Sequence, residues 1–191
     1  TLFGWTNLIY NHVTARVPDE PDHIILKPHH LLFEEVNATS IEKLDLDGNF
    51  VDQSRDKELN VAGFNIHTAV LKARPEINCV LHVHTEVGMA MSARKDGLLP
   101  LTQGAMRFYN RLAFHDYEGL SDDAAERERI TQDIGQMKAM IMRNHGLLTC
   151  GESIREALIL MKYLISSREP PLLLEARSAE ILLPDPEICE K

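Results

Sequence analysis

The clearest hydrophobic pattern in the chain is a helical repeat that changes abruptly into an extended run. From 61 to 74, apolar residues recur at three- and four-residue intervals, at Ile66, Ala69, Val70 and Ala73, which is the period of one helix face. Pro75 follows, and its ring cannot fit inside a continuing helix. The next run, Cys79-Val-Leu-His-Val-His84, is rich in strand-forming residues. We therefore predict an amphipathic helix over 61–74 and a buried strand over 79–84.

The second half of the chain is predicted to contain two more helices and two more strands. Ser153-Ile-Arg-Glu156 is a capping box, in which the serine and glutamate side chains bond to free amides at a helix start. The apolar face of that helix consists of Ile154, Leu158, Met161 and Ile165. Another helix is predicted to begin at Ser121, with two aspartates next to it and an apolar stripe at Ile130, Ile134 and Met137. The apolar runs 139–142 and 147–150 are predicted strands.

The N-terminal third consists of short apolar stretches separated by polar turns. The stretches 22–27, 31–33 and 41–46 are predicted strands. Asp45-Leu-Asp-Gly48 resembles the start of a calcium loop, but the later ligands and the terminal glutamate of that motif are absent. We interpret it as a turn. The prolines after the last helix, at 170, 171, 184 and 186, predict a tail that packs outside the core or against another subunit.

Composition indicates one ordinary globular domain over 1–191. The chain has 44% apolar and 26% charged residues, and its formal charge of -9 argues against nucleic-acid binding. The apolar runs are shorter than the roughly 20 residues of a membrane span. Three widely spaced cysteines and no signal-like start predict a reducing cytoplasm. Because the sequence starts without methionine, the extreme N-terminus is expected to be missing.

The predicted strand 79–84 carries two candidate metal ligands. Side chains two apart on a strand lie on the same face, so His82 and His84 present two imidazoles side by side. His145 is the best candidate for a third ligand, because it lies at a strand junction in Asn144-His145-Gly146, and a glycine there permits a close approach of the backbone. Three histidines bind a divalent transition metal and leave one position for a substrate oxygen.

The alternative is that these histidines are hydrogen-bonded core residues without a metal, which is the commoner role of a histidine in an apolar strand. The remaining histidines are weaker candidates for ligands. His67 lies on the predicted helix, where packing is the favoured role. The others are predicted to lie in polar loops: His12, His23, His29, His30 and His115.

Several motifs together resemble the class II aldolase/adducin family. They are Val80-Leu-His-Val-His84, Ser92-Ala-Arg-Lys-Asp-Gly-Leu-Leu-Pro100, Arg143-Asn-His-Gly-Leu147 and the upstream pair Arg74-Pro75. The run His-Asp-Tyr-Glu-Gly at 115–119 is most similar to the adducin-like branch. The resemblance extends from about Trp5 to Ser167.

The resemblance implies an α/β fold with a central, mostly antiparallel sheet flanked by helices in three layers. It also implies a homotetramer with active sites at subunit boundaries. In the family's sugar-phosphate aldolases two strand histidines and a later one hold Zn²⁺, and they match His82, His84 and His145. The metal in such a lyase stabilises the enolate left when a carbon-carbon bond next to a carbonyl is cleaved.

This chain departs from the aldolase pattern at the proton carrier and at the phosphate loops. Gly63 stands where the resemblance would place the catalytic glutamate, four residues before His67. Asn11-His12 replaces a Gly-Asn pair, and Lys27-Pro-His-His30 replaces a glycine-containing loop, which removes the flexible backbone that cradles phosphate. Glu86 is a possible replacement base or second-shell partner, unless it opens a helix instead. Tyr109 or Tyr117 of a neighbouring subunit is another possible proton donor.

Two functional hypotheses follow. One is a zinc-dependent lyase that acts on a small hydroxy-carbonyl compound, with its base unidentified. The other is a non-catalytic, adducin-like binding or assembly module that retains the metal site and binds an actin-type protein partner.

Overall fold

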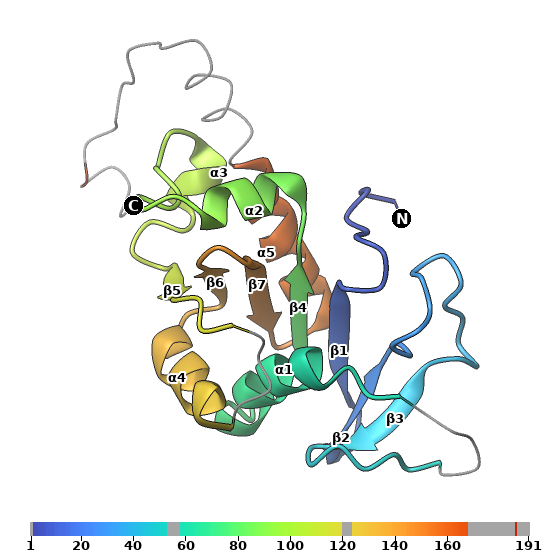
Figure 1. Cartoon of the computed structure of the whole chain (residues 1–191). Helices are drawn as coiled ribbons and strands as arrows, with labels where there is room; N and C mark the ends of the chain where they lie inside the picture. Colours follow the sequence, from blue (N-terminus) through green and yellow to red (C-terminus); the bar gives the residue numbers. More distant parts are fainter. Residues whose placement is uncertain (1, 53–57, 120–123, 168–185, 187–191) are drawn as a thin grey trace.

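A seven-stranded sheet forms the centre of the molecule. The computed structural model describes residues 2–52, 58–119, 124–167 and 186, and its strands lie in the order β3-β2-β1-β4-β7-β6-β5 (Figure 1). Their bounds are β1 His12–Val17, β2 Glu20–Leu26, β3 Glu42–Asp45, β4 Cys79–Val83, β5 Ala113–His115, β6 Ala139–Met142 and β7 Gly146–Gly151. Only β5 and β6 pair in parallel; the other neighbours are antiparallel. The expectation of a mostly antiparallel sheet is confirmed.

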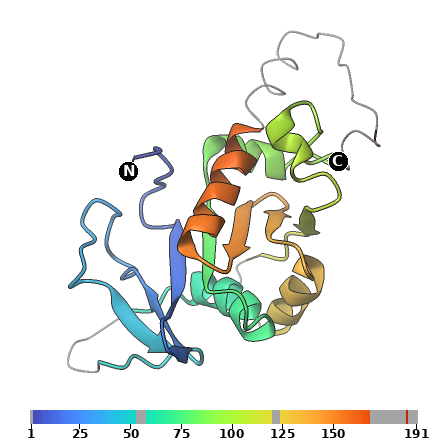
Figure 2. The same cartoon turned by 180° about the vertical axis from the view of Figure 1, so that it is seen from behind.

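Helices cover both faces of this sheet, so the expected three layers are also confirmed. The helices α1 Val61–Ala73 and α4 Ala124–Ile134 pack on one face, where Ile66 and Ile130 share a core with Val80 of β4. The helices α2 Glu86–Ser92 and α5 Ile154–Ser166 pack on the other face, where Met161 contacts the cluster of Leu81. The short α3 Gln103–Met106 lies beside α5. Figure 2 shows α5 crossing in front of the sheet.

The helix boundaries follow from side-chain caps. Asn60 accepts a hydrogen bond from the amide of Gly63 at the start of α1, and Ser153 accepts one from the amide of Glu156 at the start of α5, as the capping box predicts. Thr85 caps α2 in the same way, through the amide of Gly88. Each cap uses an amide that has no partner within its own helix.

Most predicted elements are present, but the N-terminal third differs. The stretch 31–33 forms no strand, because it lies in a turn-rich loop between β2 and β3. The strand β1 was not predicted, and the loop assignments of His12, His23 and His115 are wrong: these residues lie in β1, β2 and β5. The proposed start of α4 at Ser121 and most of the tail fall outside the described residues.

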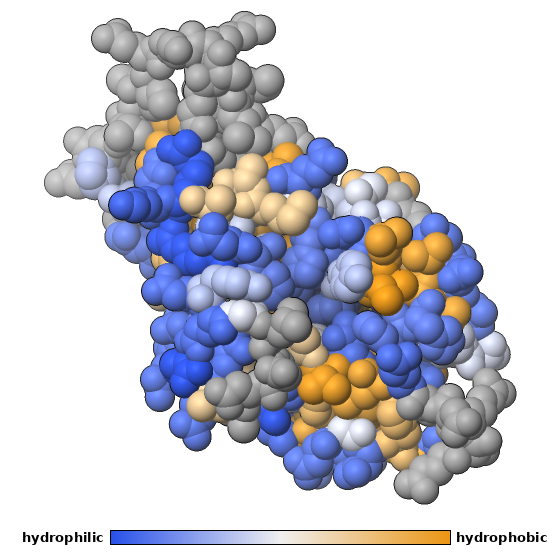
Figure 3. Space-filling model, viewed as in Figure 1, coloured by the Kyte–Doolittle hydropathy of each residue, from blue (hydrophilic) through white to orange (hydrophobic). Residues whose placement is uncertain are grey.

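The surface of the described part of the chain is mainly polar on the face where α1 lies. Figure 3 shows hydrophilic side chains over most of this face, with hydrophobic ones in separate patches. Among the described residues, no helix has the length and apolar character needed to cross a membrane.

Candidate metal centre

The strand β4 places His82 and His84 on the face of the sheet that α1 covers. It lies between β1 and β7 at the centre of the sheet, and all five of its residues are buried. Val80 belongs to the core under α1, whereas Leu81 and Val83 belong to the core under α5. This alternation is that of a regular strand. His82 is fully buried, and His84 is half-buried just beyond the end of β4.

His145 reaches the same place from the tight connection between β6 and β7. Asn144 adopts a left-handed backbone with φ 53°, a conformation that asparagine tolerates better than most residues, and its amide donates to the carbonyl of Ser92 at 3.0 Å. A Cβ at Gly146 would lie 2.6 Å from the carbonyl oxygen of Val83. The connection can therefore approach the end of β4 only because residue 146 has no side chain.

The three imidazoles converge. The ring centroids of His82 and His84 are 4.6 Å apart, and each lies 4.8 Å from the ring of His145. One ligand nitrogen from each residue lies within 4.8 Å of the other two. Sequence spacing explains the pair at 82 and 84, whereas the pairing of β4 with β7 brings in His145.

The hydrogen bonds of His82 favour a metal-binding tautomer. Its Nδ1 lies 3.0 Å from the carbonyl oxygen of Leu147; a carbonyl can only accept, so Nδ1 carries the proton and Nε2 carries the lone pair. That Nε2 lies 2.7 Å from Nε2 of His84. A tetrahedral zinc ion with Zn–N distances of about 2.0–2.1 Å holds two ligand nitrogens roughly 3.3 Å apart. The separations in this cluster bracket that value, so the donor set fits a divalent transition metal.

Electrostatics keeps these rings neutral, as metal ligands must be. Burial, with smaller contributions from the neighbouring His84 and His115, lowers the pKa of His145 to about 4. Burial likewise lowers the pKa of His84, and it lowers the pKa of His82 well below its ordinary value, with added repulsion from His12. A cation can therefore bind near pH 7 without first displacing protons from imidazolium rings.

His12 is part of this histidine cluster, although it was predicted to lie in a loop. It pairs with His82 across β1 and β4, and the two rings stack with centroids 5.4 Å apart. The ring of His12 also fills the space beside Gly63: a Cβ built there would meet its Cε1 and Nε2 at 2.8 Å. The space that the side chain of a glutamate at 63 would enter is thus occupied by an imidazole.

The polar face of β1 contacts α1 at three successive helical turns. His12 packs on Gly63, the hydroxyl of Thr14 lies 2.7 Å from Nδ1 of His67, and Arg16 donates to the carbonyl of Leu71 at 2.8 Å. Two strand residues and four helix residues advance by similar distances, about 6.8 Å and 6.0 Å. The polar residues 12, 14 and 16 alternate with Val13, Ala15 and Val17, and this alternation is the signal that could have revealed β1.

His67 has a structural role on α1. It is fully buried, and burial lowers its pKa to about 3. Its contact with Thr14 joins α1 to β1, which agrees with the packing role predicted for it. His67 does not belong to the three-histidine group, but its ring contacts that of His12 edge-on, with centroids 5.3 Å apart.

A cavity of about 320 Å³ adjoins the three histidines. Its polar lining comes from β1, the start of α1, the end of β4 and the connections near 117 and 145, and consists of Tyr10, His12, Asn60, His82, His84, Tyr117, Asn144 and His145. The ring of Tyr117 lies 6.1 Å from that of His145. Among the described residues that line this cavity, none is Asp, Glu, Lys or Arg.

Two other residues that the sequence suggested lie outside this lining. Glu86 is exposed in the first turn of α2, where a carboxylate is favoured by the helix dipole, so the helix-opening role is the one that the structure supports. Tyr109 follows α3 and is likewise not among the residues around the cavity.

In the stretch Lys27-Pro-His-His30, the side chain of Lys27 is hydrogen-bonded to the backbone of its own loop. Lys27 is buried, and its ammonium group donates to the carbonyls of Pro28, His29 and Leu31. An ammonium group has three protons, so these acceptors use all of them. Lys27 therefore holds the loop after β2, and its ammonium group has no further proton to donate to a ligand.

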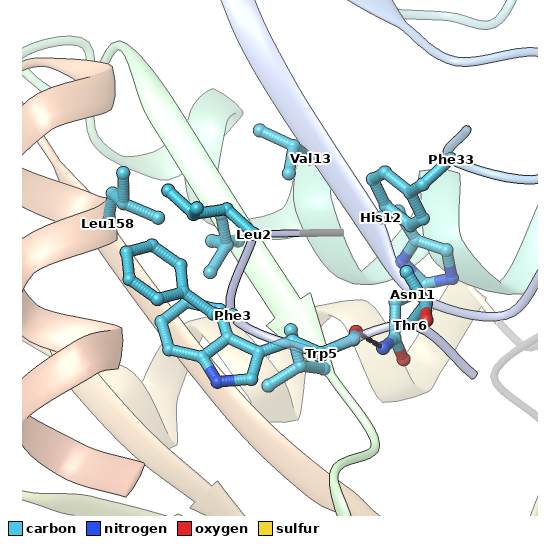
Figure 4. A pocket seen from close by; sticks show the side chains of 11 residues that line it. Leu2, Phe3, Trp5, Thr6, Asn11, His12, Val13, Phe33 and Leu158 are labelled. Atoms are coloured by element: carbon cyan, nitrogen blue, oxygen red, sulfur yellow. Dashed lines mark hydrogen bonds between the residues drawn. The ribbon is translucent and has the colours of Figure 1, made fainter. Parts of the chain in front are cut away.

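Asn11 joins the N-terminal segment to the candidate metal centre. Its side chain accepts from the amide of His84 at 2.8 Å and donates to the carbonyl of Trp5 (Figure 4). The residues around it border a second cavity of about 270 Å³, which is mainly apolar. Leu2, Phe3 and Leu158 point into that cavity in Figure 4.

His115 lies behind the cluster and is paired with acidic groups of α4. It is 2% exposed, and its ring nitrogens lie 2.7 Å from a carboxylate oxygen of Asp133 and 3.5 Å from one of Glu126. Its carbonyl accepts from the amide of Arg143, two residues before His145. His115 thus fixes β5 and α4 beside the connection that carries His145.

A mixed sheet with helices on both faces and three convergent imidazoles at the end of its central strand defines an α/β protein with a candidate trihistidine metal centre. The family model for the class II aldolase and adducin N-terminal domain matches residues 1–169. The chain therefore belongs to the class II aldolase and adducin family, as its motifs suggested.

Both aldolase-like proteins and adducins are similar to this chain. A Caulobacter vibrioides protein whose name assigns it to aldolase class 2 is 43% identical over 163 residues, which is 85% of this chain and 63% of that protein. Rat α-adducin is 43% identical over 170 residues, 88% of this chain and 23% of that protein. The crystal structure of an aldolase II superfamily protein from Pseudomonas syringae matches 99% of this chain and 77% of its own, with 40% identity and a TM-score of 0.91. The chain thus spans less than two thirds of these two sequence relatives.

Proposed function

We propose that the protein is a metal-dependent, aldolase-like lyase that acts on a small hydroxy-carbonyl compound. The observation that carries this proposal is the convergence of His82, His84 and His145, each with a ligand nitrogen within 4.8 Å of the others, beside an open cavity. Three neutral imidazoles with one free coordination position are the donor set of a catalytic metal site, and they suit Zn²⁺ or another divalent transition metal.

The proposed reaction needs stabilisation of an enolate, which a bound cation would supply, and movement of a proton, which the residues of the cavity would perform. When bound, the cation would supply Lewis-acid stabilisation of the enolate oxygen that forms when the carbon-carbon bond breaks. The tautomer of His82 is fixed by the carbonyl of Leu147, which orients its Nε2 for binding. A proton must also be moved. With glycine at 63, the candidates that line the cavity are the hydroxyls of Tyr10 and Tyr117 and the ring of His12.

The proposal extends to assembly and compartment. We propose a homotetramer in which a neighbouring subunit completes the substrate site, as the family resemblance implies. A cytoplasmic setting is consistent with the free, buried thiols of Cys79 and Cys150. Burial raises the pKa of these thiols to about 12 and about 11, so neither is a reactive thiolate at neutral pH.

The test is metal-dependent turnover. Purified protein is assayed for bound Zn²⁺, Mn²⁺ and Co²⁺ and then for aldehyde release from a panel of hydroxy-carbonyl compounds, with and without a chelator. The expected result is aldehyde release that a chelator abolishes and that re-added metal restores. Bound metal without turnover on any compound would contradict the lyase proposal.

The alternative is a non-catalytic, adducin-like binding or assembly module that retains the metal site. It is favoured by the 43% identity to rat α-adducin and by the imidazole that occupies the place of a carboxylate beside Gly63. Under this alternative, saturable binding to an actin-type partner is expected without aldehyde release. If the metal serves folding alone, a chelator lowers the melting temperature and leaves partner binding unchanged.

A further inference from the structure

The charge of the histidine cavity is the feature that the proposed function leaves unexplained. Its described lining contains four imidazoles, two phenols and two amides, without an acidic or a basic side chain. His82, His84 and His145 are the three of these imidazoles whose ligand nitrogens converge within 4.8 Å of one another. With a divalent cation on three of them, the cavity would carry two positive charges that no residue of the described lining balances.

Position 63 supplies no side chain to the cavity, because it is a glycine whose neighbouring space is filled by the ring of His12. A side chain at 63 would project into the ring of His12, 2.8 Å from its Cε1 and Nε2. The ring is held in turn between the rings of His67 and His82. The imidazole of His12, buried at its Nδ1 and without a hydrogen-bond partner there, therefore occupies the space that a side chain at position 63 would enter.

An uncompensated charge in a partly buried site is costly and is relieved by a ligand of the opposite sign. A phosphate group is disfavoured, because the described lining contains no Lys or Arg, and Lys27, which lines an adjoining small pocket with His12, donates to three backbone carbonyls. A carboxylate needs no such partner, because one carboxylate oxygen and an adjacent hydroxyl or carbonyl oxygen can chelate the cation together.

We propose that this cavity selects a small carboxylate, a 2-hydroxy or 2-oxo acid, which supplies the negative charge that the protein lacks at position 63. The inference rests on the proposed metal site and names the substrate class for it. His12 would then be a specificity-determining residue, because its ring excludes a carboxylate from position 63 and leaves that charge to the ligand.

The test compares a carboxylate with its neutral amide, which has the same size and the same adjacent hydroxyl. Protein loaded with Co²⁺ is titrated with glycolate and with its neutral amide, glycolamide, and binding is followed by calorimetry and by the visible spectrum of the metal. Glycolate is expected to bind at least tenfold more tightly than glycolamide, and inorganic phosphate more weakly than glycolate. Equal binding of acid and amide, or tighter binding of phosphate, would overturn the inference.

Two matched substitutions test whether the preference for a carboxylate depends on the charge of the cavity lining. Asn60→Asp places a negative charge in the lining and keeps the acceptor that caps α1. Asn37→Asp makes the same change in an exposed turn, where Oδ1 also acts as an acceptor. Glycolate binding is expected to weaken about tenfold in the first variant and to stay unchanged in the second. Should Asn60→Asp fail to fold, Asn144→Asp makes the same change in the lining and keeps a residue type suited to a left-handed backbone.

The variants also separate this inference from the proposed function. If Asn60→Asp weakened the binding of glycolate and of glycolamide equally, the inference would be overturned, because a charge effect leaves the affinity for the neutral ligand unchanged. Metal-dependent aldehyde release from neutral compounds without a preference for carboxylates would overturn the inference and leave the lyase proposal standing. Failure to take up any metal would overturn both.

Discussion

The ring of His12 lies where the side chain of residue 63 would be, with its Cε1 and Nε2 2.8 Å from the position of a Cβ on Gly63. His12 comes from β1 and Gly63 from the first turn of α1, so the two residues set how closely the strand and the helix approach. Both residues line the cavity beside the three histidines, so this contact links the packing of the strand and the helix to the candidate site.

This contact predicts that the effect of Gly63→Ala on the free energy of unfolding changes sign when His12 is replaced by alanine. Gly63→Ala is expected to destabilise the protein by about 1–3 kcal/mol, because the new methyl group overlaps the ring of His12. In a His12→Ala background the same substitution should stabilise it by about 0.5–1 kcal/mol, because alanine is the better helix former. Urea unfolding of the four proteins measures both values. Additive effects would contradict the steric contact.

The proposed metal site predicts a selective loss of bound metal in His84→Ala. Two remaining imidazoles hold a divalent ion poorly, so bound Zn²⁺ should fall from about one per chain to a small fraction, as measured by metal analysis after dialysis. Far-UV circular dichroism should stay unchanged, because His84 lies beyond the end of β4. The control is His30→Ala, which removes an exposed histidine outside the cluster. Unchanged stoichiometry in His84→Ala would contradict the assignment.

Gly146 is predicted to couple the backbone to the metal. In Gly146→Ala the methyl group would lie 2.6 Å from the carbonyl oxygen of Val83, and this backbone atom can move only if the connection shifts. We expect a loss of about 2 kcal/mol or more in unfolding free energy and a loss of about tenfold or more in Zn²⁺ affinity.

The control for this substitution is Gly135→Ala. Gly135 has φ 47°, and the nearest atom to a Cβ there is 3.8 Å away. It should therefore cost about 1 kcal/mol of left-handed strain without changing metal affinity. If both variants bound Zn²⁺ like the parent protein, the proposed coupling would be wrong.

The buried histidines predict acid sensitivity of the metal-free protein. Burial lowers the pKa of His67 to about 3 in the folded state, whereas the unfolded chain takes up that proton near pH 6.5. Between these values the unfolded state binds more protons, so stability is complete above about pH 6.5 and decreases as the pH falls toward 3. Urea unfolding at pH 7, 6 and 5 measures the slope.

The contribution of His67 can be isolated by substitution. In His67→Gln the slope of unfolding free energy against pH should become shallower by up to about 1.4 kcal/mol per pH unit within this window, the value for one proton. His30→Ala, which changes an exposed histidine, should leave the slope unchanged. The same slope in all three proteins would show that His67 does not titrate in this way.

Elements whose hydrophobic period and caps depend on nearby residues could be predicted from the sequence. The helical repeat before Pro75 and the apolar run after it gave α1 and β4 to within a residue of their ends, and the capping box gave the start of α5. These features depend on contacts between residues a few positions apart. The side-by-side placement of His82 and His84 follows from the two-residue period of the same strand.

The surroundings of His82 and His84, in contrast, depend on how distant parts of the chain pack together. The pairing of β4 with β7 brings His145 to them, and its pairing with β1 brings His12, which is 70 residues away in sequence. If β4 continued to residue 86, the side chain of Glu86 would lie on the same face as His82 and His84. Because β4 ends at Val83, Glu86 lies instead in the first turn of α2. Local propensity does not determine where the strand ends. Register between strands is set by the packing of the whole sheet, so the composition and the charge of the cavity could not be predicted from the spacing of its histidines.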